Sequence, residues 1–87
     1  MRNELTEQEV VTLLRELLAD IFELTDDVGL DEDLAREREA DSLQWLELMS
    51  EVEHRLGIRI DARAWRSAST LAGLAELTLS KLVTRQP

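Results

Sequence analysis

The chain has 87 residues, with 19 acidic and 10 basic side chains, a formal net charge of −9 and no cysteine. This length predicts one small domain, residues 1–87, near the lower limit of what a single hydrophobic core stabilises without disulfides or metal. Because the chain contains no cysteine, it can form no disulfide, thiolate nucleophile or cysteine-bearing zinc site. Its negative charge argues against binding to the phosphates of nucleic acid.

The amino-terminal residues predict neither secretion nor membrane insertion. They continue into charged residues rather than an apolar run, and no stretch approaches membrane-spanning length. A chain without cysteine also gains nothing from an oxidising compartment. We therefore expect a cytoplasmic monomer that binds neither membrane nor nucleic acid and attracts basic protein partners.

A first helix is predicted to begin after Thr6. Thr6 and Glu9 have the spacing of a capping box, in which each side chain accepts a hydrogen bond from the other residue's backbone amide. Apolar residues at helical spacing then predict a core-facing stripe: Val10, Leu13, Leu14, Leu17, Ile21 and Leu24. Three more, Val11, Leu18 and Phe22, widen the stripe, so we expect this helix to be covered on more than one side.

The apolar periodicity lapses from Thr25 to Ala40, where charged residues dominate. We interpret this segment as a long ordered loop that has room for a short helical turn. Val28, Leu30 and Leu34 are predicted to pin it onto the helices.

The second main helix is predicted from about Ser42 to Leu56. Asp41 and Ser42 both carry side chains that accept hydrogen bonds from first-turn amides. The helical period gathers the following residues into one core sector: Trp45, Leu48, Met49, Val52 and Leu56.

A different side of this helix carries Leu43 and Leu46. With Glu47, Glu51 and Glu53 around them, they predict a docking patch for a partner that offers an apolar hollow edged with Arg or Lys. For Leu46, contact with the preceding loop is the alternative interpretation.

Predictions for the rest of the chain complete the fold. Gly57 is suited to a left-handed helix cap, and Asp61 is predicted to cap a short third helix, residues 62–66. Trp45 and Trp65 are interpreted as core residues rather than ligand platforms, because each follows helical spacing and neither sits in an aromatic cluster. Ser69 or Thr70 opens the last helix, whose predicted stripe is Leu71, Leu74, Ala75, Thr78 and Leu82.

The junction at Ser42 is the candidate functional position. A helix N-terminus presents free N–H groups and the positive end of the helix dipole, which favour a negative group such as a phosphate ester on a serine hydroxyl. An Asp-Ser pair before a helix is nevertheless most often only a cap.

A wider pattern surrounds this pair. Asp41-Ser42-Leu43, Glu47-Leu48, Leu56-Gly57-Ile58 and Ile60 resemble the phosphopantetheine-bearing helix of the acyl carrier protein family and the loop that follows it. Val28, Leu34 and Thr70-Leu71 also fall at positions that match the family, so the resemblance runs from about Thr6 to about Val83.

The resemblance implies an all-α four-helix bundle of the acyl-carrier type, with three main helices, one short helix and a long loop between helices one and two. It implies a free-standing carrier whose Ser42, flanked by Asp41 and Leu43, receives phosphopantetheine from coenzyme A through a phosphopantetheinyl transferase. The thiol of that group would carry acyl or polyketide intermediates between loading and thioester-processing enzymes. We expect basic surfaces on these enzymes to contact Leu43, Leu46, Glu47 and Glu51.

Two alternatives stay open at this point. One is an aminoacyl or peptidyl carrier, and the other is an acidic helical interaction module without a prosthetic group.

The sequence also departs from the family where Arg38-Glu39 replaces a usual Leu-Gly pair. Arg36 and Arg38 are interpreted as solvated loop charges, with a place near the phosphodiester as the alternative.

Intrinsic catalysis is not expected. A serine hydrolase would need His54 beside Ser42, yet twelve residues of one helix separate them by about 18 Å. His54 is the only histidine, and without cysteine it cannot complete a transition-metal site of the usual kind. We therefore predict a protein that is not an enzyme and binds no metal.

Overall fold

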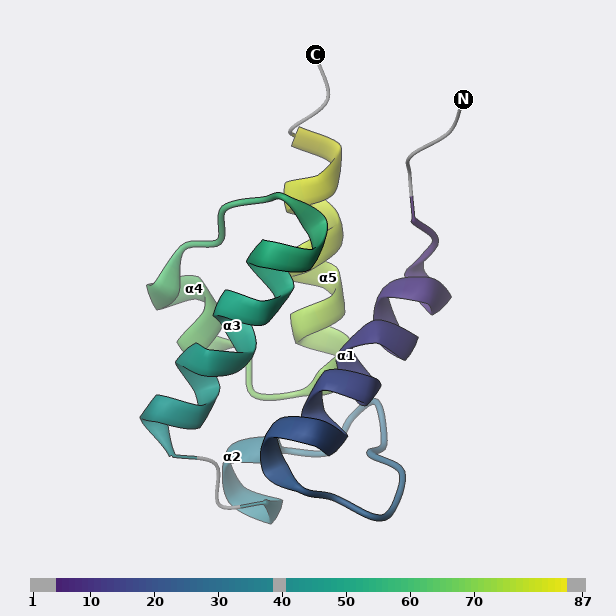
Figure 1. Cartoon of the computed structure of the whole chain (residues 1–87), viewed down its shortest axis with the longest axis vertical. Coiled ribbons are helices and arrows are strands. Elements are labelled where there is room, and N and C mark those ends of the chain that lie inside the picture. Colours follow the sequence, from purple (N-terminus) through teal and green to yellow (C-terminus); the bar gives the residue numbers. More distant parts are fainter. Residues whose placement is uncertain (1–4, 39–40, 85–87) are drawn as a thin grey trace.

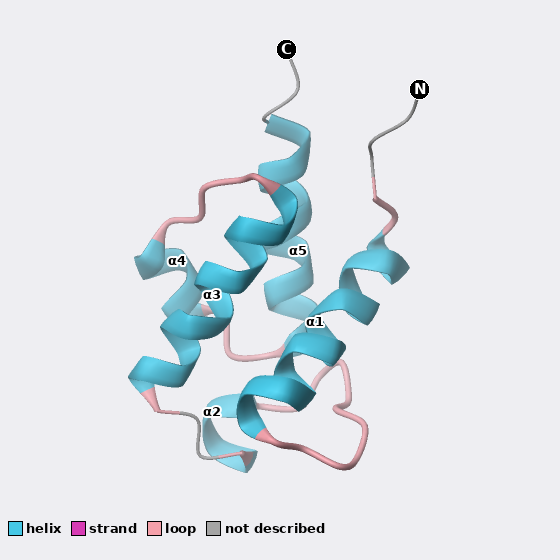
Figure 2. Ribbon diagram, viewed as in Figure 1, coloured by secondary structure: helices cyan, strands magenta, loops and turns pink. Residues whose placement is uncertain are grey.

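The predicted main helices are all present (Figure 1). The structure, a computed structural model, describes residues 5–38 and 41–84, and these residues form helices and no strand. The elements are α1 (Glu7–Phe22), α2 (Leu34–Glu37), α3 (Ser42–Leu56), α4 (Ala62–Ser67) and α5 (Leu71–Thr84). The all-α fold class, with three main helices and a short one before the last, is confirmed. The long loop additionally contains the one-turn helix α2, as Figure 2 shows.

The helix α1 packs against both α3 and α5, and α4 bridges α3 and α5. In Figure 1, α1 runs downward whereas α3 and α5 run upward, so α1 is antiparallel to its two long neighbours. The short helix α2 lies at the lower end of the bundle, where α3 begins. The loop and the N-terminus of α3 are thus brought to the same end of the molecule.

The helix boundaries follow local hydrogen bonding. The capping box is confirmed, because Thr6 Oγ1 accepts from the Glu9 amide at 3.1 Å and Glu9 Oε1 accepts from the Thr6 amide at 2.8 Å. At the C-terminus of α3, Gly57 takes the left-handed conformation with φ of 65°, which a glycine adopts without steric cost. Asp61 caps α4 as predicted, and Thr70 opens α5 by accepting from the Gly73 amide at 3.0 Å.

The predicted stripes form the core. Every residue of the stripe predicted on α5 is buried: Leu71, Leu74, Ala75, Thr78 and Leu82. The buried residues of α1 and α3 are Val10, Val11, Leu14, Leu17, Leu18, Trp45, Leu48 and Val52. The other predicted members are partly exposed and pack against this core: Leu13, Ile21, Phe22, Leu24, Met49 and Leu56. Burial of this apolar area is the main stabilising contribution to so small a fold.

The loop before α3 is held by two side chains and by backbone hydrogen bonds. Val28 and Leu34 are buried as predicted. The side chain of Leu30 is 46% exposed, so the prediction that it anchors the loop through its apolar group is wrong. Leu30 contributes its carbonyl instead, which accepts from the Ala72 amide at 2.9 Å, while the Leu34 amide donates to the Ser69 carbonyl at 2.8 Å. The loop is therefore joined to the start of α5 by main-chain bonds, which no side-chain pattern predicts.

Arg38 also holds the loop, contrary to the interpretation of it as a solvated charge. Its guanidinium donates two hydrogen bonds to Asp26, each 3.0 Å long, and two to Glu32. Its side chain is only 18% exposed. Charge-assisted bonds with this geometry are stronger than those of a simple surface pair. Arg36, in contrast, is exposed.

An aromatic cluster joins α3 to α4, and the expectation that the two tryptophans lie outside such a cluster is wrong. The Trp45 indole N–H donates to the Trp65 carbonyl at 3.0 Å, and the Trp65 indole N–H donates to the Trp45 carbonyl at 2.8 Å. Phe22 meets Trp45 edge-on at 6.5 Å between ring centroids. Both tryptophans are buried, so the prediction that they belong to the core is confirmed.

Substitutions on α3 test this core. Leu48→Ala should lower the free energy of unfolding by about 2–5 kcal/mol and Trp45→Ala by about 3–5 kcal/mol, because each leaves a cavity in a buried site. Leu43→Ala is the matched control, since Leu43 is 77% exposed on the same helix. Thermal and denaturant melting measure all three. Equal melting of Leu48→Ala and Leu43→Ala would contradict the inward face assigned to α3.

The Arg38 cluster makes a prediction about pH. Hydrogen bonds from Arg38 lower the pKa of Asp26 and of Glu32 below their ordinary values. A carboxyl whose pKa is lower in the folded than in the unfolded state stabilises the fold above the unfolded pKa, and this contribution is lost as pH falls through the folded pKa. The melting temperature of Arg38→Gln should therefore lie below that of the parent at pH 7, with the difference shrinking below about pH 4.

Arg36→Gln is the control for this experiment, because Arg36 lies two residues away with an exposed side chain. It should match the parent at every pH. A difference between the parent and Arg38→Gln that is the same at pH 7 and in acid would show that the ion pairs do not stabilise the loop.

Candidate functional site

Asp41 and Ser42 have different roles at the start of α3. Asp41 is the cap residue: its backbone is extended, and its Oδ1 accepts from the Gln44 amide at 2.8 Å. Ser42 is the first residue of the helix, and its side chain is exposed. Of the two acceptors that the sequence offers, only Asp41 acts as the cap. The Ser42 hydroxyl forms no hydrogen bond within residues 5–38 and 41–84 and is free to react.

The electrostatics at Ser42 favour a negative substituent. The first turn of α3 contains no acidic side chain, and the amides that open a helix carry the positive end of its dipole. The Gln44 amide is already bonded to Asp41, which leaves the amides nearest Ser42 without an intrahelical acceptor. A phosphate ester on the Ser42 oxygen would meet this positive end.

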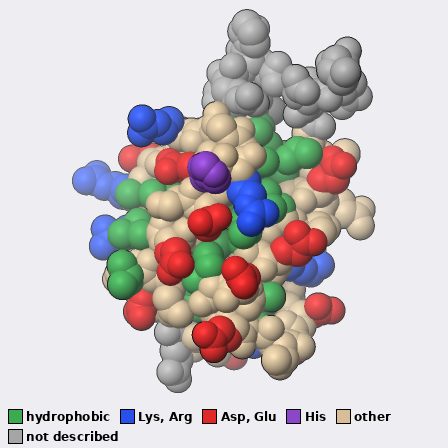
Figure 3. Space-filling view, in the orientation of Figure 1, with side chains coloured by type: hydrophobic (Ala, Val, Ile, Leu, Met, Phe, Trp, Pro, Cys, Tyr) green, Lys and Arg blue, Asp and Glu red, His purple; other side chains and the backbone are tan. Residues whose placement is uncertain are grey.

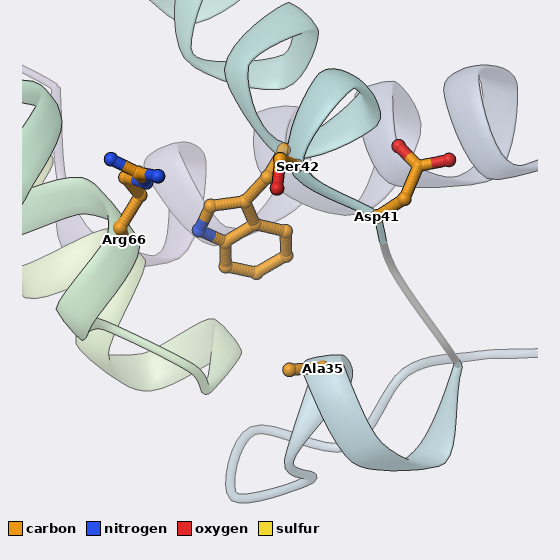
Figure 4. A pocket seen from close by; sticks show the side chains of 5 residues that line it. Ala35, Asp41, Ser42 and Arg66 are labelled. Carbon is orange, nitrogen blue, oxygen red and sulfur yellow. The ribbon is translucent and has the colours of Figure 1, made fainter.

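An open hollow of about 200 Å³ lies beside Ser42 (Figure 4). Its wall comes from three helices and the cap residue: Ala35 of α2, Asp41, Ser42 and Trp45 of α3, and Arg66 of α4. Figure 4 shows Ser42, Arg66 and Ala35 around this hollow, each from a different helix. Covalent attachment of phosphopantetheine requires an accessible hydroxyl, and the helix N-terminus favours the phosphate ester, so the residues present fit that group.

The predicted docking residues differ in their exposure to solvent. Leu43 is 77% exposed, Leu46 is half-buried, and Glu47 is exposed. Glu51 is partly buried and pairs with Arg55 one turn away at 3.8 Å, so its charge is partly balanced. Figure 3 shows acidic side chains spread across the face that α1 and α3 present.

Catalytic groups are not assembled around Ser42 in the part of the chain that the structure describes. The helix α3 is continuous, which keeps His54 in its last turn, and His54 is exposed. No three His, Cys, Asp or Glu side chains among the described residues are placed to hold a metal ion. None of the helices in these residues is both long and apolar enough to span a membrane.

Sequence reasoning assigned Trp45 to the core alone, although it also lines the hollow, and missed two further lining residues. Ala35 and Arg66 belong to short helices far apart in the chain, and neither stands in a motif. The arginine spacing along α4 gives no signal by itself, because exposed arginines at helical spacing are usually solvated. Only the packing of α4 on α3, fixed by the two tryptophans, brings Arg66 near Ser42.

Comparison with known proteins agrees with the geometry. The sequence model of the family described as "Phosphopantetheine attachment site" matches residues 12–78, which is most of the chain. The chain is also 39% identical over 74 residues to "Polyketide-8 synthase acyl carrier protein 2" of Streptomyces avermitilis, an alignment that spans 79% of this chain and 80% of that protein. No solved structure matches significantly.

These matches decide against one of the two alternatives that the sequence left open, the interaction module. A family match over most of the chain is not expected of an acidic interaction module without a prosthetic group. Phosphopantetheine is therefore the cofactor, and the role of the protein involves contact with synthase and transferase enzymes. The chain belongs to the acyl carrier protein family, the carriers that bear phosphopantetheine.

Proposed function

We propose that Ser42 is the residue to which phosphopantetheine is attached. The observation that carries this proposal is the exposed Ser42 hydroxyl, which opens α3 and forms no hydrogen bond within the described residues. Other serines differ in position. Ser50 lies in mid-helix, and the Ser67 and Ser80 hydroxyls donate to the carbonyls of Arg63 and Leu77.

A phosphopantetheinyl transferase would use coenzyme A as the donor. Ser42 Oγ attacks the phosphorus that bears the pantetheine, the bond from that phosphorus to the bridging oxygen breaks, and adenosine 3′,5′-bisphosphate leaves. The proton of the hydroxyl passes to a base of the transferase, because Asp41 is engaged as the helix cap. The positive end of α3 favours the negative charge on the product ester.

The attached group supplies the thiol that this cysteine-free chain lacks, and that thiol holds the cargo as a thioester. The chain itself supplies the hydroxyl, the helix terminus and a surface for enzymes, and we propose that it catalyses no reaction of its own. The name of the relative favours polyketide intermediates over fatty acyl or aminoacyl groups. A single domain over residues 1–87, a monomeric state and a cytoplasmic location without membrane or nucleic-acid partners remain predictions.

The surface beside Ser42 is the proposed docking site for these enzymes. Leu43 offers an exposed apolar side chain next to the attachment residue, and Leu46 lies one turn further along α3. Glu47 and Glu51 add negative charge, which suits enzymes with basic docking surfaces. The pairing of Glu51 with Arg55 suggests that Glu47 contributes more of the attraction.

Intact mass after incubation with a transferase and coenzyme A tests the attachment residue. The parent should gain one phosphopantetheine, and Ser42→Ala should gain none. Ser42→Ala should fold normally, since Asp41 and not Ser42 caps α3. Ser50→Ala, which removes an exposed serine from the same helix, should be modified like the parent. Modification of Ser42→Ala would remove the proposed site.

A salt series tests the docking surface. The double variant Glu47→Lys, Glu51→Lys should be modified more slowly than the parent at low salt, and the difference should shrink as salt screens the charges. Leu46→Ala should weaken the complex at every salt concentration, because apolar contact is not screened. Asp20→Lys with Glu76→Lys changes the net charge equally at exposed positions of α1 and α5. If this control slows modification as much as the α3 variant, net charge and not a docking site on α3 is responsible.

A further inference from the structure

The hollow beside Ser42 has two chemically different parts. Trp45 and Ala35 give it apolar walls, whereas its charged part consists of Arg66 of α4 and of Asp41, whose Oδ1 accepts from the Gln44 amide. Trp45 is 7% exposed, so only a small part of this buried residue faces the hollow. The reciprocal bonds with Trp65 hold the Trp45 ring in place, and α4, which carries Arg66, is held by the same bonds.

Within the described residues, four arginines form no ion pair and no side-chain hydrogen bond, and of these Arg36, Arg59, Arg63 and Arg66 only Arg66 lines the hollow. Its side chain is exposed, and it forms neither an ion pair nor a side-chain hydrogen bond with any residue in 5–38 or 41–84. Some arginines of this acidic chain bind carboxylates. Arg38, for example, takes two. Within the described residues, the five N–H donors of Arg66 are therefore unused, and they can bind a group that comes from outside.

Phosphopantetheine brings the complementary groups in a fixed order. Next to the serine oxygen is a phosphodiester, then a carbon that carries two methyl groups, and then a hydroxyl and an amide carbonyl. An acceptor-rich arm with an apolar branch near its attachment point suits a hollow that Ser42 shares with apolar side chains and with an arginine.

We propose that this hollow seats the proximal half of the phosphopantetheine arm. The dimethyl carbon packs against Trp45 and Ala35, and Arg66 donates hydrogen bonds to oxygen atoms of the arm. The inference rests on attachment at Ser42. Covalent attachment keeps the arm at a high effective concentration beside the hollow, so contacts that are weak for a free ligand are sufficient to seat it. The arm is then oriented along α4 and not dispersed in solvent.

The first measurement locates the arm directly. In the modified protein, nuclear Overhauser effects should connect the two methyl groups of the arm with ring protons of Trp45. A mass-verified modified protein that lacks these signals would overturn the inference while leaving attachment at Ser42 intact. An unmodified protein would instead count against the attachment proposal, so the two failures are distinguishable.

The second measurement is a cycle of four melting temperatures, for the parent and Arg66→Gln, each with and without the arm. If the hollow seats the arm, modification should raise the melting temperature of the parent. Arg66→Gln should lose most of this rise, while its melting temperature without the arm should equal that of the unmodified parent. Arg63→Gln is the matched control, since Arg63 lies one turn earlier on α4 and does not line this hollow. An equal rise in the parent and Arg66→Gln, or an equal loss in both variants, would contradict the role given to Arg66.

Discussion

The two indole N–H groups that cross between Trp45 and Trp65 are the interaction on which the candidate site depends. Each tryptophan satisfies its own buried donor with the backbone carbonyl of the other, so neither ring carries an unpaired polar group into the core. The pair links the first turns of α3 to the short helix α4. A six-residue helix has little stability of its own, and this packing gives α4 a defined place. The hollow beside Ser42, with Arg66 at its edge, exists because α4 is held there.

A second constraint acts on the other side of Ser42. The loop before α3 is long, yet it is fixed by buried Val28 and Leu34, by backbone bonds to the start of α5, and by Arg38. These contacts bring α2, and with it Ala35, to the N-terminus of α3. A carrier needs no catalytic side chains, but it needs its attachment residue to be presented in a reproducible way. Here a fixed loop and a fixed short helix flank a serine that is itself exposed.

Local patterns in the sequence were sufficient for the main helices. The capping box at Thr6, the cap at Asp41 and the glycine at position 57 each mark a boundary that depends on residues a few positions apart, and the structure has these boundaries. The apolar period on α5 predicted a stripe whose five members are all buried. Such features are predictable because their physical cause lies within one turn of helix.

The features that the sequence did not predict join residues far apart in the chain. Arg38 reaches Asp26 and Glu32, the indoles pair across twenty positions, and Leu30 contributes a carbonyl where an apolar anchor was expected. Arg66 becomes part of the site only through such a pairing. The attachment serine was found from sequence because its motif is local, whereas the surroundings of that serine were not.

The most direct test of the account is to locate the modification by fragmenting peptides of the protein after its co-expression with a phosphopantetheinyl transferase. The account predicts that fragment ions place one phosphopantetheine on Ser42 within the segment that opens α3. An adduct on any other hydroxyl, or a fully folded protein that stays unmodified with a transferase of broad specificity, would contradict it.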